Sequence, residues 1–344
     1  MRLFSNEIVF RGHPDKVCDQ ISDALVDEFI KEDKKSRCAI ETMGGKGKIF
    51  ITGEVTSKSR VDIPKVVKRV LKDVGYSCNY EIINNIGVQS RDIAMGTNNE
   101  VMGAGDQGMM FGYACNDNDK FLPTSMVILQ ELSKKYDDLR KTDSRFKSDG
   151  KAQITGYYDE DMKLLSIKTF TISYQNTEKE RSETDKIIKN ICDEICSKYN
   201  IKVKEYLINP TGKFEIGGFE GDAGLTGRKI VVDSYQGFAP VGGGAFSGKD
   251  PTKVDRSGAY KARLIAIHYL KKYNLKWCKV QLSYAIGIRK PLAIYIDSDK
   301  GNLPEEVTIN KYKSLYEECE PKNMIDDLNL LNETFYEKSK FGHF

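Results

Sequence analysis

The sequence predicts an α+β fold made of three structurally related α/β units with a pseudo-threefold arrangement. The first observation is an order of two strand-like runs followed by a helix, which occurs three times along the chain. The second is the length of 344 residues, which exceeds what one small domain needs. The third is a hydrophobic content of 40% with 10% aromatic residues, which is typical of packed globular domains and argues against disorder.

The three units are placed by their strand pairs and by the helix after each pair. The strand pairs are predicted at residues 37–43 with 48–55, 151–158 with 163–174, and 279–286 with 291–296. The helices are predicted at residues 62–74, 178–199 and 304–318. Residue identity between the units is negligible, so the argument rests on the order of the elements alone.

Another helix is predicted to begin at the motif GHPDK, residues 12–16. Pro14 suits the first turn of a helix. Apolar residues then recur every four positions, at Val17, Ile21, Leu25 and Phe29. His13 and Asp15 therefore lie at the helix N-terminus, where amide N–H groups and the helix dipole attract anions. A phosphate-side donor at His13 and a metal ligand at Asp15 would suit this position, and so would an ordinary helix cap.

Residues 217–256 combine closely spaced glycines with acidic and basic side chains. Loops this rich in glycine usually need a positive φ or a close backbone approach. Cations that alternate with carboxylates suit a polyphosphate held partly by Lys and Arg and partly through a divalent metal. The apolar run at residues 230–232 predicts a buried strand between the two glycine clusters, which disfavours a flexible linker.

One tempting motif in this segment is rejected. Residues 243–249, GGAFSGK, match G-x-x-x-x-G-K, but a Walker A loop needs Ser or Thr next, and Asp250 stands there. Pro251 follows, and the helical pattern starts only near Asp255. The sequence therefore supports a phosphate-contacting glycine loop and not a P-loop.

A polar segment separates the first two units. Residues 94–102, AMGTNNEVM, have little periodicity and lead into GAGDQG at residues 103–108. A gate that leads into a rigid site loop and an idle connection both fit this pattern. Glu41 and Glu54 lie in the first strand pair, where glutamates usually face solvent.

Composition argues against several classes of function. The net charge of +3, from 53 basic and 50 acidic residues, gives no general signal for nucleic-acid binding. The N-terminus lacks an apolar signal region and no stretch approaches ~20 apolar residues, so a cytoplasmic protein without a membrane span is expected. The eight cysteines are scattered, and only Cys192 and Cys196 are close, without a histidine beside them. Reduced thiols are favoured over a zinc site.

The motifs GHPDK, GAGDQG and GGGAFSGKD occur in one chain and in that order. In this respect the sequence closely resembles S-adenosylmethionine synthetases (methionine adenosyltransferases), over nearly its whole length. The resemblance implies three interleaved α/β domains, placed here at residues 1–92, 103–216 and 217–344, with a gating loop at residues 93–102. It also implies a homodimer with active sites shared between subunits, often a dimer of dimers, with ATP and L-methionine as substrates and with two Mg²⁺ per site and K⁺ as cofactors.

The resemblance also implies roles for individual residues. Asp15 and Asp255 would serve magnesium, and Glu41 would serve potassium. The methionine site would contain Glu54, Gln89, Asp222 and Lys253. The ATP site would contain His13, Asp149, Gly150, Lys151, Lys213, Phe214, Asp222, Arg228, Lys229, Ala245 and Lys249. Those with catalytic roles would be His13, Lys151, Arg228, Lys229 and Lys249. Two positions depart from the family pattern, because Val241 stands where a histidine is usual and Lys213 where an arginine is common.

The reaction implied is attack of the methionine sulfur on C5′ of ATP, which expels triphosphate for cleavage to pyrophosphate and phosphate. A thioether is a neutral nucleophile that needs no base, which agrees with a sequence that shows no evident Ser-His or Cys-His pair. The cations and magnesium would align the reactants and neutralise the leaving group. The alternatives are a catalytically silent ATP-binding regulatory homologue, which would be favoured by loss of a phosphate or metal residue, and a phosphotransferase, which would need Ser or Thr at position 250.

Overall fold

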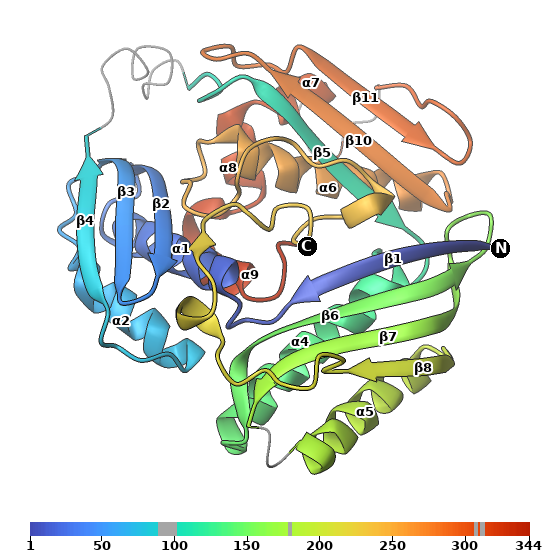
Figure 1. Cartoon of the computed structure of the whole chain (residues 1–344). Coiled ribbons are helices and arrows are strands. Elements are labelled where there is room, and N and C mark those ends of the chain that lie inside the picture. Colours follow the sequence, from blue (N-terminus) through green and yellow to red (C-terminus); the bar gives the residue numbers. More distant parts are fainter. Residues whose placement is uncertain (89–101, 178–180, 306–308, 310–313) are drawn as a thin grey trace.

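The computed structural model describes residues 1–88, 102–177, 181–305, 309 and 314–344. These residues form three sheets, each with helices packed against it (Figure 1). The strand orders are β4-β3-β2-β9, β1-β6-β7-β8 and β11-β10-β5. The predicted α+β fold with three α/β units is confirmed.

The first sheet is built around a hairpin near the N-terminus. Its strands are β2 (Arg37–Gly45), β3 (Lys48–Thr56), β4 (Glu81–Gly87) and the short β9 (Gly224–Leu225). Two helices pack against it, α1 (Pro14–Glu32) and α2 (Ile63–Val74). The apolar positions predicted for α1 from their four-residue spacing are all buried. The predicted hairpin and both helices are therefore confirmed.

The second sheet is formed by β1 (Arg2–Val9), β6 (Phe146–Tyr158), β7 (Leu164–Asn176) and β8 (Val203–Ile208). It packs with α4 (Thr124–Thr142) and α5 (Arg181–Lys198) around a core rich in isoleucine and aromatic residues. β1 runs antiparallel to β6, with Val9 opposite Lys151. The predicted strand pair is confirmed, and so is the described part of the helix that follows it.

The third sheet contains β5 (Gly108–Cys115), β10 (Trp277–Tyr284) and β11 (Ala293–Ser298), and α6 (Val254–Lys272) crosses β5 and β10. The short helices α7 (Leu315–Glu318) and α8 (Pro321–Asp327) follow. The predicted helix at residues 304–318 is wrong over the described residues before α7. The Leu303 N–H donates to the Ile296 carbonyl, which keeps the chain beside β11. Of the described residues in this range, those in helix follow Ser314, whose hydroxyl accepts from Glu317 N–H.

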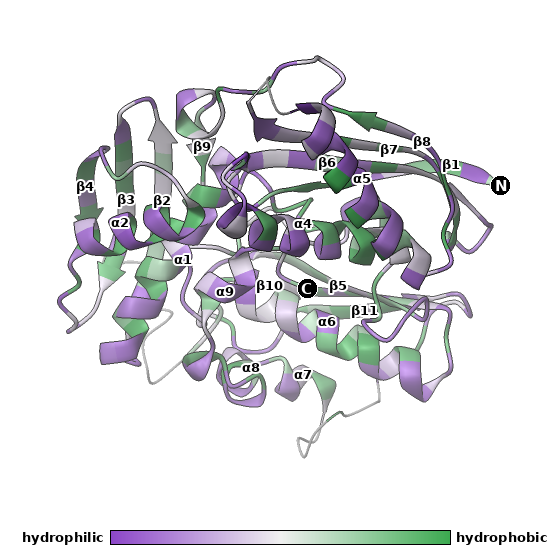
Figure 2. Cartoon of the chain, turned by 90° about the horizontal axis from the view of Figure 1, so that it is seen from below, coloured by the Kyte–Doolittle hydropathy of each residue, from purple (hydrophilic) through white to green (hydrophobic). Residues whose placement is uncertain are grey.

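Each sheet takes one strand from a distant part of the chain. β1 joins the sheet of β6, β5 joins the sheet of β10, and β9 joins the sheet of β2. The larger helices α1, α4 and α6 carry hydrophobic stretches beside hydrophilic ones (Figure 2), as amphipathic helices on a sheet do. No helix in the described ranges is long and apolar enough to cross a membrane.

The strand predicted at residues 230–232 is wrong. Residues 228–235 form consecutive turns that lead into the short 3-10 helix η3 (Gln236–Phe238). Backbone groups bond within the segment, since Asp233 N–H donates to Lys229 O at 2.8 Å and Gln236 N–H to Val231 O at 3.1 Å. Val231 is 50% exposed, so the apolar run does not enter the core as a strand would.

The last residues of the chain run into the middle of the molecule. The helix α9 (Phe335–Ser339) is capped from a distance, because the Asp27 carboxylate accepts from the N–H groups of Phe335 and Tyr336 at 2.9 Å each. Beyond it, Nδ1 of the buried His343 and the Tyr260 hydroxyl share a hydrogen bond of 2.7 Å. The Phe344 ring stacks on the Tyr235 ring at a centroid distance of 4.8 Å.

This distant cap predicts a pH-dependent stability. Burial raises the pKa of Asp27 to about 7, although the two N–H groups lower it. Between pH 7 and pH 4 the folded chain therefore binds a proton that the unfolded chain does not, so stability from this group rises as the pH falls. From pH 8 to pH 5.5, the unfolding free energy of the wild type should gain about 2 kcal/mol relative to Asp27→Asn. Chemical denaturation measures this, and equal pH profiles for the two proteins would contradict it.

Candidate active site

Four of the residues predicted to contact phosphate or metal gather at the N-terminus of α1. His13 is the N-cap, and its Nδ1 accepts from Asp15 N–H at 3.2 Å. The buried Asp15 carboxylate lies 2.5 Å from Lys229 Nζ and 3.3 Å from Arg228 Nε. Asp15 Oδ1 also accepts from Leu225 N–H at 2.9 Å, which joins the helix start to the glycine-rich segment.

The imidazole of His13 is a neutral donor in this setting. Burial, and then the charge of Lys229, lower the pKa of His13 to about 4, although Asp15 opposes this. The ring is therefore uncharged at pH 7. Because Nδ1 accepts a hydrogen bond from a backbone amide, Nε2 carries the hydrogen and is able to donate to an oxyanion.

Three of the predicted cations line one cavity of about 430 Å³, namely Lys151, Arg228 and Lys229. Lys151 lies on β6 opposite β1, and its Nζ is 3.2 Å from the Glu7 carboxylate. Residues of β1, Gln153 of β6, and residues of the turns and of η3 after Lys229 complete the lining. The cavity thus carries a concentration of positive charge next to the helix N-terminus of α1.

Three other predicted nucleotide residues lie near the beginning of β6 and after β8. Asp149 accepts from Gly218 N–H at 2.7 Å, and burial raises its pKa to about 6 despite this bond. Gly150 has no room for a side chain, because a Cβ would lie 2.4 Å from the Phe10 ring. Phe214 is tied to the end of β7 through its carbonyl, which accepts from Asn176 N–H at 2.9 Å.

Two further predicted nucleotide residues are more exposed. The exposed Lys213 Nζ lies 3.2 Å from the Glu215 carboxylate. Asp222 is also exposed, and its carboxylate accepts from Ala223 N–H at 2.8 Å. The charge of Asp222 contributes to the raised pKa of Asp149, so these two carboxylates belong to one neighbourhood.

A second cavity, of about 160 Å³, contains a different group of predicted residues. It is lined by Glu54, Lys249, Lys253 and Asp255 together with residues of β2 and of the GAGDQG loop. Lys249 forms an ion pair with Asp255. The turn before Lys249 requires glycine, since Gly248 has a φ of 84° and a Cβ there would lie 1.9 Å from the Ile40 carbonyl oxygen.

Asp106 in this second cavity was not predicted as a site residue. Its carboxylate accepts from Gln107 N–H at 2.7 Å, within the GAGDQG loop. The three glycines around it were the available signal, but the spacing alone did not show that this loop faces Glu54 and the lysines of the glycine-rich segment.

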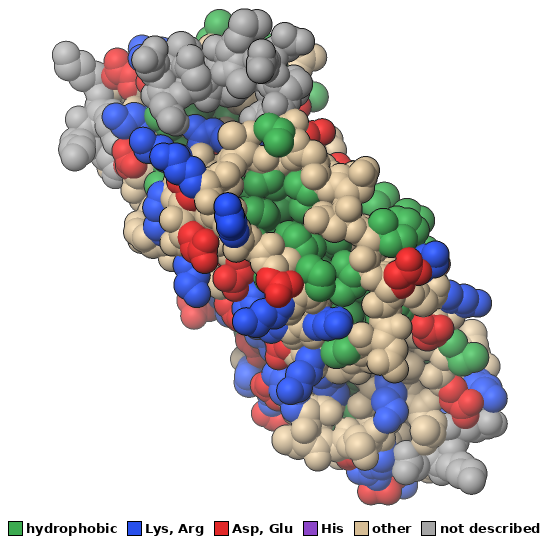
Figure 3. All heavy atoms as spheres, turned by 90° about the vertical axis from the view of Figure 1, so that its left-hand side faces the viewer, with side chains coloured by type: hydrophobic (Ala, Val, Ile, Leu, Met, Phe, Trp, Pro, Cys, Tyr) green, Lys and Arg blue, Asp and Glu red, His purple; other side chains and the backbone are tan. Residues whose placement is uncertain are grey.

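The other predicted site residues are Ala245, Glu41 and Gln89. Ala245 lies beside Gly227, where a Cβ would come within 2.7 Å of the alanine side chain. Glu41 is exposed on β2. Gln89 and residues 93–101 of the predicted gate lie outside the described residues. On the face toward the left of Figure 1, Figure 3 shows hydrophobic side chains in the middle with charged side chains around them.

The donor set fits magnesium better than a metal held by protein alone. Within the described ranges, no three His, Cys, Asp or Glu side chains converge as a complete metal site. Asp15 and Asp255 each offer one carboxylate, and each is already paired with a lysine. Magnesium usually takes only one or two carboxylates and completes its shell with water and substrate phosphates.

Known proteins match the chain along its whole length. Family models for the N-terminal, central and C-terminal domains of S-adenosylmethionine synthetase match residues 1–95, 101–214 and 216–344. A protein of Staphylococcus epidermidis named S-adenosylmethionine synthase is 40% identical over 100% of this chain and 92% of its own. Proteins with the same name from Petrotoga mobilis and Clostridium tetani are 39% and 40% identical, over 99% and 100% of this chain and 93% and 94% of theirs.

Proposed function

Because the chain belongs to the S-adenosylmethionine synthetase family, we propose that it is a methionine adenosyltransferase that joins ATP and L-methionine. The methionine sulfur attacks C5′ of ATP, the C5′–O bond breaks, and triphosphate leaves with the bonding electrons. The triphosphate is then hydrolysed to pyrophosphate and phosphate. The observation that carries this proposal is the convergence of neutral His13, buried Asp15 and the Arg228–Lys229 pair at one helix N-terminus.

This reaction requires alignment of the sulfur with C5′ and neutralisation of the triphosphate charge more than it requires proton transfer. The nucleophile is uncharged, whereas the leaving group gains negative charge as the bond breaks. Lys151, Arg228 and Lys229, which line one cavity, would offset that charge, and each such donor is typically worth roughly 3 kcal/mol at the transition state. The Nε2–H of His13 would donate to a bridging oxygen of the triphosphate, a role that a neutral imidazole can fill.

Metal ions would complete this site. Asp15 and Asp255 would hold two Mg²⁺, and Glu41 would hold K⁺. When bound, these ions would neutralise phosphate charge. Each of these aspartates lies beside a lysine, Lys229 or Lys249, so the ions would be held next to the cations proposed to contact phosphate.

We further propose that each active site is shared between two subunits of a homodimer. Arg228 and Lys229, which pair with Asp15 two residues after His13, line one cavity of the chain, and Lys249 lines another. In the dimer, the first cavity of one subunit would face the second cavity of its partner. Glu54, Lys253 and Gln89 would then bind methionine, with Asp222 near both substrates, while Asp149, Gly150, Lys213, Phe214 and Ala245 would surround the nucleotide.

Product analysis tests the enzyme class. The purified protein is incubated with ATP, methionine, magnesium and potassium, and the products are separated by mass. A sulfonium nucleoside together with pyrophosphate and phosphate is expected. ADP would instead indicate a phosphotransferase, and absence of turnover would indicate a silent ATP-binding homologue.

The bound leaving group leads to a separate prediction. Since the same cations would hold triphosphate after adenosyl transfer, added triphosphate should be hydrolysed, and faster with S-adenosylmethionine present. A phosphate-release assay with and without the sulfonium product measures this. Accumulation of free triphosphate at the rate of S-adenosylmethionine formation, without pyrophosphate, would contradict the second step.

A further inference from the structure

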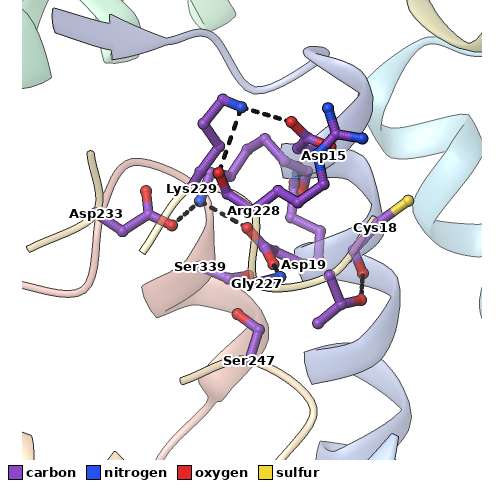
Figure 4. A network of polar contacts seen from close by, with 12 residues as sticks. Asp15, Cys18, Asp19, Gly227, Arg228, Lys229, Asp233, Ser247 and Ser339 are labelled. Atoms are coloured by element: carbon purple, nitrogen blue, oxygen red, sulfur yellow. Dashed lines mark hydrogen bonds and ion pairs between the residues drawn. The ribbon is translucent and has the colours of Figure 1, made fainter. Parts of the chain in front are cut away.

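The turns that carry Arg228 and Lys229 are held by side chains of α1. Gly227 N–H, directly before the two cations, donates to Asp19 Oδ1 at 2.8 Å (Figure 4). In the sequence, Asp233 follows Lys229 by four residues, so Gly227 and Asp233 flank the two cations. From Gly227 onward the segment is therefore held by contacts with the helix, after β9 has left the sheet.

A buried lysine links these two ends. Lys16 Nζ donates to Asp19 Oδ2 at 3.1 Å and also forms an ion pair with Asp233. The side chains of Lys16, Asp19 and Asp233 are only 1%, 3% and 5% exposed. We call these three residues the clamp. It fixes Gly227 through Asp19 and fixes Asp233 through Lys16, so it brackets both cations.

Stability alone is a weak reason to bury this group. Removing three charges from water is costly, and well-packed apolar residues are often as stable or more so. The desolvation cost is visible at Asp233, where burial raises the pKa to about 6 although Lys16 lowers it. What the clamp supplies is geometry, because the Asp19 carboxylate bonds the Gly227 amide with one oxygen and Lys16 with the other.

We propose that Lys16, Asp19 and Asp233 are positioning residues, which place the Arg228 and Lys229 side chains for binding triphosphate. This inference rests on the proposed function, in which those two cations contact the phosphates. The clamp itself touches no substrate. It acts through the backbone at Gly227 and Asp233.

The chain contains a matched control cluster. Lys261 on α6 lies between Glu318 and Asp327, with Nζ 3.4 Å and 2.7 Å from their carboxylates. Its three side chains are 0%, 0% and 10% exposed. This cluster also buries one lysine between two carboxylates, but it joins α6 to α7 and α8 and lines neither cavity of the candidate site.

The test compares Asp233→Asn with Asp327→Asn in the full-length protein. Calorimetry gives the dissociation constants of tripolyphosphate and of adenosine, and thermal unfolding gives the stability. Both variants should lose stability. Only Asp233→Asn should weaken tripolyphosphate binding, by about tenfold or more, as expected for loss of a group that orients a ligand-binding side chain. Adenosine binding should stay within twofold of wild type in both.

Equal weakening of tripolyphosphate binding in the two variants, or no weakening in either, would overturn the inference. Should Asp233→Asn fail to fold, Asp19→Asn replaces it, because its amide oxygen still accepts from Gly227 N–H while its charge toward Lys16 is lost. If wild-type protein makes no S-adenosylmethionine but the contrast between the variants holds, the proposed reaction fails and the positioning role stands. If wild type does not bind tripolyphosphate, the phosphate assignment is wrong and the inference falls with it.

Discussion

Asp15→Asn should lower turnover by roughly a hundredfold at limiting magnesium while the protein keeps its fold. The carboxylate is buried at the start of α1, where it pairs with Lys229 and Arg228. A hard metal ion needs the negative charge of this carboxylate, and the substitution removes that charge. Asparagine keeps an oxygen for Leu225 N–H, and the substitution leaves the His13 cap in place. Initial rates over a magnesium titration, with circular dichroism for the fold, measure the effect.

The matched control is Asp62→Asn at the N-terminus of α2. Asp62 is that helix's N-cap and accepts from Lys65 N–H at 3.1 Å, so the same substitution is made at another helix N-terminus. The turnover of the Asp62→Asn protein should equal that of wild type, since asparagine caps a helix as well as aspartate does. Near-normal activity of Asp15→Asn at limiting magnesium would remove Asp15 from the proposed metal site.

Two inactive variants should restore activity to each other if the active sites are shared. We expect His13→Asn and Lys249→Met to be inactive when each is made alone. In a two-fold dimer, one site of each heterodimer collects both changes and the other collects neither. Random pairing makes about half of the dimers mixed, so roughly a quarter of all sites should be intact after co-expression. Activity per site, compared with wild type, measures this fraction.

Differently tagged subunits sharpen the experiment. A heterodimer purified through both tags and confirmed by mass spectrometry should carry about half of the wild-type activity. If that heterodimer is as inactive as either parent, His13 and Lys249 serve the same site from one chain. The enzyme class would stand, but the proposed place of the glycine loop across the interface would be wrong.

The spacing of residues along the sequence predicted the helices and hairpins that interactions between sequence neighbours fix. Pro14 and the four-residue spacing after it placed α1, and the alternating runs placed the hairpins. The strand at residues 230–232 failed because a short apolar run does not show its tertiary surroundings. There the backbone turns are set by contacts with α1, through partners such as Asp19 and Lys16 that are remote in sequence.

The candidate site shows the same division. Motif resemblance supplied most of its residues, and the structure places three of them at one cavity and four at another: Lys151, Arg228 and Lys229, and Glu54, Lys249, Lys253 and Asp255. Asp106 and the clamp were missed because their importance depends on which loop faces which helix. Asp27 was missed for the same reason, since it caps a helix 308 residues away. Such long-range pairs leave no periodic signal in a single sequence.

The exchange of strands between the three sheets has a consequence for how the chain folds. β1 and β6 can pair only after a loop of more than a hundred residues has closed, and β2 and β9 need a longer one. Such a topology has a high contact order. The chain must lose the entropy of closing these loops before strand pairing stabilises it, so folding is expected to be slow. A fragment of residues 1–88 would contain β1 without β6, and β2 without β9, leaving strand edges open. Truncated products of this chain should therefore aggregate, and they should not fold as smaller independent domains.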